Sequence, residues 1–147
     1  MTAARRLSTT APSAAADVVL AEAGQEWTRA FVAELGRRLQ LDALDRLLMV
    51  WDLSASKAAT IFGVSRQALS KWRTGGVPDD RLVPLADLAA ATDVLMRYVR
   101  ADRIPAVVRR PAEVLGGASL LELAEAGRTA EVRAAVVAMV DLRRVAP

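Results

Sequence analysis

The sequence contains no cysteine and no histidine among its 147 residues. The absence of cysteine excludes a disulfide framework and a thiol nucleophile. With histidine also absent, a zinc site built from Cys or His ligands is excluded, and so is the most common general base of enzymes. No phosphate-binding loop or cluster of carboxylates stands in their place. We therefore expect no catalytic residues, no metal ion and no cofactor, in a protein that is not an enzyme.

Aromatic residues are also scarce, at 4 % of the chain, although 53 % of the residues are hydrophobic. A core must then be built mainly from Ala, Leu and Val. These residues recur at helical spacing, and almost no run alternates apolar with polar residues. The sequence predicts an all-α protein. We expect Trp51 and Trp72 to pack in the core, whereas Trp27 could instead lie at an oligomer contact.

Long hydrophobic runs are missing as well. The longest run late in the chain, residues 134–140, is far shorter than the roughly 20 residues that cross a bilayer, so we expect no membrane segment and a cytoplasmic location. Residues 1–16 combine two arginines with small residues, which is faintly typical of a targeting peptide. The apolar stretch at residues 18–20 is too short for one, and we expect a disordered arm over residues 1–16.

Acidic residues are absent from one particular region. The chain has 17 Asp and Glu residues, but none lies between Leu53 and Pro78, where Lys57, Arg66, Lys71 and Arg73 occur. The net charge of the whole chain is only +3, so the positive excess is local. A local basic surface is the electrostatic footprint of a nucleic-acid-binding protein.

The same region contains two short predicted helices joined by a glycine. Ser54 and Ser65 are good N-caps for helices over about residues 55–62 and 66–73, and Gly63 can adopt the left-handed conformation between them. A helix-turn-helix needs a small residue where its helices cross, a glycine in the turn and inward apolar residues in its second helix. The positions that meet these needs are Ala59, Gly63, Val64, Leu69 and Trp72.

The outward positions of this predicted motif carry the side chains that read DNA. Arg pairs with guanine and Gln with adenine in the major groove, whereas Ser and Lys hold phosphates. The predicted DNA-binding residues are Lys57, Ser65, Arg66, Gln67, Ser70, Lys71 and Arg73. The alternative is a helical hairpin whose basic face is only solvated.

Helical patterns also flank this region. One begins at Asp17 and is weakened by Gly24 and Gly36, which could split it into two helices. Further helices are predicted over about residues 41–51 and 81–99, followed by a loop around Pro105 and Pro111. Ser119 and Glu122 form a capping-box pattern, and a last helix runs from about Thr129 to Arg143. We expect an arm (1–16), a helix-turn-helix lobe (17–80) and a C-terminal partner-binding domain (81–147).

Two stretches of the sequence resemble one known family. The stretch ASKAATIFGVSRQALSKWRTGGVP looks like a helix-turn-helix of the Xre/Cro type. The stretch RRPAEVLGGASLLELAEAGRTAEVRAAV resembles the toxin-binding domain of the Xre/MbcA/ParS antitoxins. The two stretches and the helix between them span about Leu41 to Val140, in the order of that family.

The resemblance implies a homodimeric antitoxin that binds double-stranded operator DNA, represses its own operon and blocks a RES-domain toxin that consumes NAD. In such antitoxins the C-terminal segment tends to reach the toxin's active site. The partner-binding residues that the resemblance implies here are Gly116, Gly117, Arg143, Arg144, Val145, Ala146 and Pro147. The glycines could equally serve only to end a helix, and the tail could be a frayed end.

Two other functions fit the same sequence. A stand-alone helix-turn-helix regulator would use the C-terminal domain only for assembly, and a purely structural helical protein would not bind DNA. A neighbouring gene for a RES-type toxin would favour the antitoxin over the first alternative, and salt-sensitive DNA retention would exclude the second.

Overall fold

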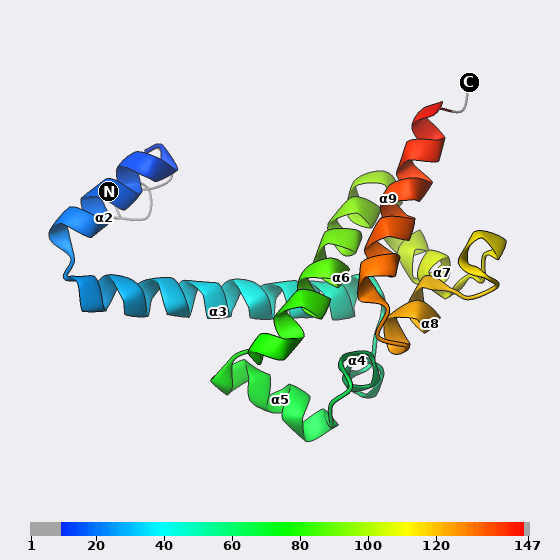
Figure 1. Cartoon of the computed structure of the whole chain (residues 1–147), viewed down its shortest axis with the longest axis horizontal. Coiled ribbons are helices and arrows are strands. Elements are labelled where there is room, and N and C mark those ends of the chain that lie inside the picture. Colours follow the sequence, from blue (N-terminus) through cyan, green and yellow to red (C-terminus); the bar gives the residue numbers. More distant parts are fainter. Residues whose placement is uncertain (1–9, 146–147) are drawn as a thin grey trace. The chain divides into compact units, whose positions relative to one another are not determined.

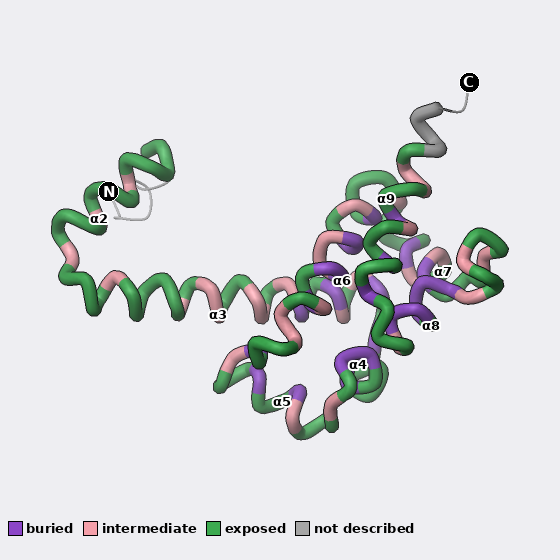
Figure 2. Tube along the Cα trace, viewed as in Figure 1, coloured by how far each residue is buried: buried purple, intermediate pink, exposed green. Residues whose placement is uncertain are grey.

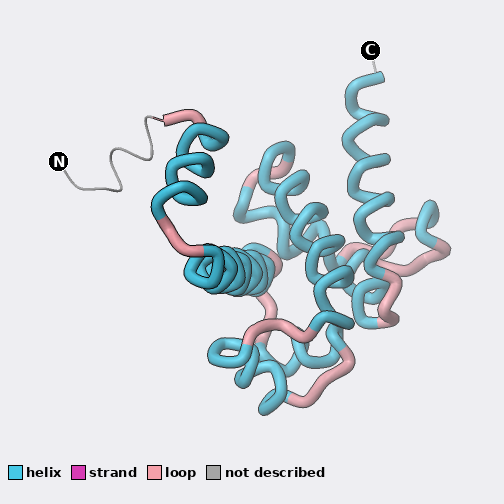
Figure 3. Tube along the Cα trace, turned by 60° about the vertical axis from the view of Figure 1, so that its left-hand side comes forward, coloured by secondary structure: helices cyan, strands magenta, loops and turns pink. Residues whose placement is uncertain are grey.

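The computed structural model describes residues 10–145, and side chains as far as Asp141. Helices and loops alone make up this part of the chain (Figure 3), so the predicted all-α class is confirmed. None of the described helices has the length and apolar character needed to cross a membrane. The α-helices are α2 (Pro12–Glu22), α3 (Gln25–Val50), α4 (Ala55–Phe62), α5 (Arg66–Gly75), α6 (Asp79–Tyr98), α7 (Ile104–Arg109), α8 (Leu120–Glu125) and α9 (Thr129–Val145), with 3-10 turns η1 (Ala101–Arg103) and η2 (Glu113–Leu115) (Figure 1).

The chain divides into two compact units, Met1–Arg38 and Leu39–Pro147. The boundary that we expected between residues 80 and 81 therefore falls inside the second unit. The physical reason is a shared core, because buried side chains of α4 and α5 cluster with those of α6, α8 and α9. Figure 2 shows buried residues along the elements of the second unit.

The first unit, as far as it is described, has no core. None of the residues from Thr10 to Arg38 is buried. The disordered arm expected over residues 1–16 is wrong for residues 12–16, which form the first turns of α2. Proline at the start of a helix and a run of alanines favour helix without any packing. The rest of that expectation, for residues 1–9, lies outside the described residues.

Helix α3 continues through Gly36, where we had allowed for a break. Glu34 accepts hydrogen bonds from Arg37 and Arg38, at 2.7 and 2.8 Å, so its ion pairs span the glycine. Pairs three and four residues apart stabilise a helix locally. Hydrogen bonds from these two guanidinium groups lower the pKa of Glu34 from 4.5 to about 2.

The second unit is organised around α6 and α9, which pack along each other. Leu88 on α6 and Val132 and Val136 on α9 are fully buried in the core between them. A polar contact also ties the two helices: Thr129 donates a hydrogen bond to the buried carboxylate of Asp87 at 3.1 Å, and Arg133 forms an ion pair with it at 3.2 Å. Both partners of Asp87 lie on α9, so the contact fixes the register of the two helices.

A short helix, α7, occupies part of the segment that we expected to be a loop. Pro105 stands in its first turn, where a missing backbone N–H costs nothing. The Arg109 guanidinium of α7 donates hydrogen bonds to the backbone oxygens of Trp51 and Asp52, at 2.8 and 2.7 Å. These carbonyls follow the end of α3, where a helix leaves acceptors unsatisfied. Arg109 therefore joins α7 to the end of α3.

Candidate nucleic-acid interface

The turn between α4 and α5 has the local geometry that the sequence predicted. Gly63 adopts a left-handed conformation with φ of 62°. Its N–H donates to the Thr60 oxygen at 3.1 Å, and the Val64 N–H donates to the Ala59 oxygen at 2.9 Å. These two hydrogen bonds are those of a Schellman motif, which satisfies the last carbonyls of α4. A Cβ at position 63 would meet no atom within 4 Å, so backbone conformation alone favours glycine there.

Serine caps fix the start of both helices. The Ser54 hydroxyl accepts a hydrogen bond from the Lys57 N–H at 3.2 Å, and the Ser65 hydroxyl accepts one from the Ala68 N–H at 3.0 Å. Side-chain caps of this kind contribute about 1 kcal/mol each. The predicted helix over residues 55–62 is confirmed at both ends, and the second helix runs two residues beyond its predicted end, to Gly75.

The inward positions of the motif are packed as expected. Ala58 and Ala59 of α4 are buried, and Leu69 and Trp72 of α5 are buried against them and their neighbours. The rings of Trp72 and Phe62 meet edge to face, with centroids 5.4 Å apart, a favourable aromatic geometry. Val64 is half-buried and packs against the core from the turn. This packing holds α5 with its opposite face outward.

The outward face of α5 is open to solvent. Ser65, Arg66, Gln67, Ser70, Lys71 and Arg73 are all exposed. Arg66, Gln67 and Ser70 line one shallow surface depression together with Ala55. Among the described residues, no ion pair or hydrogen bond engages the guanidinium of Arg66 or the ammonium of Lys71. The structure thus brings polar side chains of the kind that reads base edges together on one accessible helix face.

Two of the predicted DNA-binding cations have carboxylate partners instead. Arg73 forms a bidentate pair with Asp45 of α3, with N–O distances of 2.6 and 3.1 Å, and these hydrogen bonds raise the pKa of its guanidinium. Lys57 forms an ion pair with Glu125 of α8. Both acids lie outside the acid-free stretch, so a scan of that stretch could not find them. Arg73 and Lys57 consequently differ from Arg66 and Lys71 in having charge partners within the protein.

The residues implied for partner binding lie in a loop and at the end of the chain. Gly116 and Gly117 both have positive φ, 69° and 84°, and the loop closes on itself through the Gly117 N–H and the Ala112 oxygen at 3.0 Å. A Cβ on either glycine would meet nothing within 4 Å. The backbone conformation therefore explains both glycines, whatever else the loop does.

Val114, beside these glycines, was not singled out from the sequence. Its side chain, in the 3-10 turn η2, is 84 % exposed.

The C-terminal residues are only partly described. Helix α9 extends to Val145, two residues beyond the expected end near Arg143. The structure gives no side-chain description for Arg143, Arg144 and Val145, and Ala146 and Pro147 lie outside the described residues. Their predicted contact role stays a prediction.

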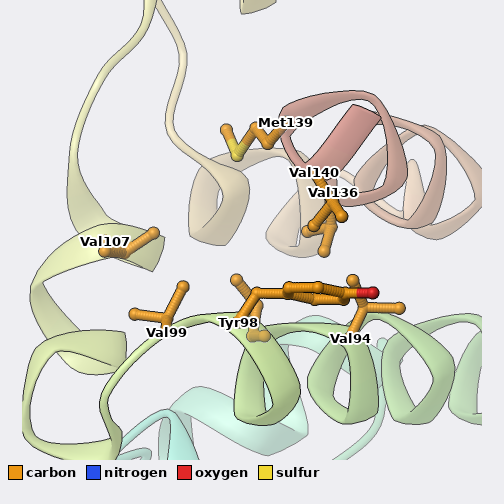
Figure 4. Close-up of a pocket in the computed structure, with 8 residues that line it drawn as sticks. Val94, Tyr98, Val99, Val107, Val136, Met139 and Val140 are labelled. Carbon is orange, nitrogen blue, oxygen red and sulfur yellow. The ribbon is translucent and has the colours of Figure 1, made fainter. Parts of the chain in front are cut away.

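An apolar recess opens near the end of α6. Its volume is about 240 Å³, and it is lined by Val94, Leu95, Tyr98, Val99, Val107, Val136, Met139 and Val140. Figure 4 shows the Tyr98 ring beneath Val136 and Val140, with Val107 and Met139 to one side. The recess is large enough for one bulky apolar side chain, and three helices (α6, α7 and α9) contribute to its wall.

Two acidic residues of the second unit, Glu122 and Asp80, have partners close by in the chain. Glu122 completes the predicted capping box with Ser119, and the Ser119 backbone N–H lowers the pKa of its carboxyl. Asp80 pairs with Arg81 at 3.0 Å. No group of three or more potential metal-ligating residues occurs in the part of the chain that the structure describes.

No protein-family model and no curated protein matches the sequence. Among solved structures, a chain in the crystal structure of the M. tuberculosis MbcT-MbcA toxin-antitoxin complex is similar, with a TM-score of 0.54 and 23 % sequence identity. The match covers 69 % of this chain and 90 % of that chain. At this identity the likeness shows a shared fold, and the all-α arrangement described above is therefore one that occurs in a toxin-antitoxin complex.

Proposed function

We propose that this protein is the antitoxin of a type II toxin-antitoxin pair. In this proposal it binds operator DNA as a dimeric autorepressor through α5, and it neutralises a RES-domain, NAD-consuming toxin by protein contact in the cytoplasm. The observation that carries the proposal is the α4–α5 pair, whose inward side chains are buried while its basic outward face is accessible. The shared fold with a chain of a toxin-antitoxin complex supports the second activity.

The DNA-binding half of the proposal assigns different roles to the side chains of α5. Arg66 and Gln67 stand in its first turn, where a recognition helix contacts base edges. Lys71 is exposed one turn further along and suits a phosphate contact. Lys57 and Arg73 could reach phosphate only after leaving Glu125 and Asp45, so we assign the main contribution to Arg66, Gln67 and Lys71, with Ser65 and Ser70 assisting.

The toxin-binding half rests on the C-terminal part of the second unit. The Gly116-Gly117 loop with its exposed Val114 and the chain end from Arg143 to Pro147 are the proposed contact regions. The apolar recess next to Tyr98 offers a further place for a toxin side chain. Interfaces commonly combine such an apolar pocket with a polar rim.

A DNA-binding titration with the promoter fragment of the protein's own operon tests the first half. Arg66→Ala or Gln67→Ala should cost about 1–3 kcal/mol and relax sequence preference. Lys71→Ala should weaken binding to all sequences and reduce the salt dependence by about one phosphate contact. Arg110→Ala, which removes an exposed charge away from α5, is the matched control. Wild-type affinity in all three α5 variants would show that α5 is not the reading helix.

Lys57→Ala is unsuited to this test. It would leave the partly buried carboxylate of Glu125 without its cation, so weaker binding could reflect lower stability alone.

Co-purification of the tagged protein from its native operon tests the second half. We expect a neighbouring gene product to be retained and its NAD consumption to be suppressed by the bound chain. Specific operator binding with no retained toxin and no toxin gene nearby would instead identify a stand-alone regulator.

A further inference from the structure

The first unit exposes a continuous row of large apolar side chains on α3. Trp27, Phe31 and Leu35 follow one another at intervals of four residues, and their exposed fractions are 54 %, 45 % and 45 %. Val32, 60 % exposed, lies beside them. We call these four residues the α3 face. Side chains four apart lie on the same side of a helix, so they form one patch.

The α3 face is already organised for packing. The rings of Trp27 and Phe31 stack with centroids 5.1 Å apart and planes within 6°. Large rigid aromatic side chains lose little conformational freedom when a partner covers them, and they dominate the energy of many interfaces. The ion pairs of Glu34 with Arg37 and Arg38 stabilise the helical turn that contains Leu35.

The α3 face has no tertiary packing within the described part of the first unit. No residue from Thr10 to Arg38 is buried, and a helical segment without tertiary packing is only marginally stable in water. Contiguous exposed apolar surface on a folded chain marks an interaction site more often than chance.

Charge decides what kind of partner fits. Residues 10–38 contain four acids (Asp17, Glu22, Glu26, Glu34) and three arginines (Arg29, Arg37, Arg38). The segment is thus nearly neutral, which disfavours nucleic acid as its partner. On the part of α3 within this segment, Glu26 stands before the α3 face and Arg37 and Arg38 stand after it, and antiparallel pairing about Phe31 brings Glu26 of one copy near Arg37 of the other. Two such segments attract each other when they run antiparallel and repel when they run parallel.

We propose that a second copy of this chain covers the α3 face, with the two α3 helices antiparallel about a two-fold axis at Phe31. Residue 27 of one copy then faces residue 35 of the other, so Trp27 packs against Leu35 at both ends. A large side chain opposite a smaller one at each level fills the space between two helices evenly. In parallel pairing, Trp27 would meet Trp27 and leave Leu35 against Leu35.

The size of the face sets the expected strength. Its exposed parts amount to roughly 400 Å² per copy, taking about 150–250 Å² for a whole aromatic side chain. About 800 Å² in total is below the standard protein interface, so we expect reversible pairing that depends on protein concentration. The use of this pairing to present two α5 helices to a palindromic operator rests on the proposed function, whereas the pairing itself does not.

Sedimentation velocity of the full chain over a range of concentrations is the first test. The wild-type mass should rise with concentration from 15.7 kDa towards twice that value. Phe31→Glu places two carboxylates at the two-fold axis and should raise the dissociation constant at least tenfold. Ala33→Glu adds the same charge about 200° around the helix and should leave self-association unchanged. The thermal transition of the second unit should be the same in both variants, because residues 31 and 33 are exposed.

Cysteine cross-linking tests the orientation, and the absence of native cysteine makes single variants clean. Phe31→Cys should form a disulfide-linked dimer on mild oxidation. Leu35→Cys alone should not, because antiparallel pairing separates the two residues by about 12 Å along the axis. A mixture of Trp27→Cys and Leu35→Cys chains should cross-link. Cross-linking of Leu35→Cys alone as efficient as that of Phe31→Cys would contradict the antiparallel arrangement.

Three results would overturn the inference. The first is a wild-type chain that stays monomeric at the highest concentrations, and the second is a Phe31→Glu chain that self-associates like wild type. If Phe31→Glu instead removes only the toxin from the co-purified complex, the toxin covers the face and the inference is wrong. Self-association without operator binding would leave this inference standing and contradict the proposed function, so the two failures are distinguishable.

Discussion

The two units of this chain use similar residues with opposite results. In the second unit Trp72 is 3 % exposed and meets Phe62 edge to face. In the first unit Trp27 is 54 % exposed and stacks on Phe31 one helical turn away. Both tryptophans belong to helices and have an aromatic neighbour. What differs is whether other helices of the same unit pack against the tryptophan.

This contrast separates helix formation from core formation. An N-terminal proline, alanines and local ion pairs suffice to define α2 and α3, whereas burial requires elements far apart in the sequence. The second unit has such elements, because α6 packs along α9 and α4 contacts α8. The described part of the first unit contains no such elements of its own, and we infer that it obtains its packing from another molecule.

The largest change in unfolding free energy is expected for a buried leucine of the second unit, in contrast to Leu35 of the α3 face. Leu88→Ala removes a fully buried side chain and should lower the free energy of unfolding of the second unit by about 2–5 kcal/mol. Leu35→Ala should leave that transition unchanged and weaken self-association instead. Chemical denaturation at low protein concentration measures the first quantity. Equal losses in the two variants would abolish the contrast between the units.

A smaller effect should follow from the polar contact inside the second unit. Asp87→Ala would leave the buried Thr129 hydroxyl and the Arg133 guanidinium without their acceptor, at a cost of about 1–3 kcal/mol. Asp93→Ala is the control on the same helix, since its ion pair with Arg46 is exposed and worth about 0–1 kcal/mol. Thermal denaturation of both variants measures the difference. If the two variants melt alike, the α6–α9 contact does not contribute to stability.

Two glycines give a test in which the sign should reverse. Gly63→Ala forces a side chain into a left-handed conformation and should destabilise the second unit by about 1–2 kcal/mol. Gly36→Ala stands within α3, where a Cβ would meet no atom within 4 Å, and should stabilise the helix by about 0.5–1 kcal/mol. Denaturant midpoints measure the first change and far-UV circular dichroism the second. A loss of helix in Gly36→Ala would show that α3 does not run through this position.

The smallest effect concerns the pH dependence of the first unit. The pKa of Glu34 is lowered from 4.5 to about 2, so its contribution to helix stability is present above about pH 4.5 and is lost as the pH falls towards 2. The helical signal of wild type should therefore decline over this range more than that of Glu34→Gln. The difference between the two titrations isolates Glu34 from the other carboxyls. Identical titration curves for the two proteins would mean that the Glu34 ion pairs do not stabilise α3.

Much of the fold could be predicted because its signals are local. Ser54, Gly63 and Ser65 each cap or turn the chain within a few residues, and the structure has α4 where the sequence placed it. The capping box of Ser119 and Glu122 was predictable for the same reason. The continuity of α3 through Gly36 was harder, because it depends on the balance between a glycine and the ion pairs around it.

The candidate site was predictable only in part. The outward positions of α5 follow from helix periodicity once Leu69 and Trp72 are taken as inward, and the structure places these residues as expected. The pairing of Arg73 with Asp45 and of Lys57 with Glu125 joins residues far apart in sequence, so no pattern within the basic stretch predicts it. The burial of Asp87 likewise depends on α9, which lies some forty residues further along the chain.

The contact made by Arg109 has a consequence for how this chain can vary. Both of its acceptors outside α7 are main-chain oxygens, and every amino acid supplies one. The hydrogen bonds themselves therefore do not depend on which side chains stand at positions 51 and 52, although Trp51 is fully buried for its packing. On the α7 side they depend on one group, the guanidinium of Arg109.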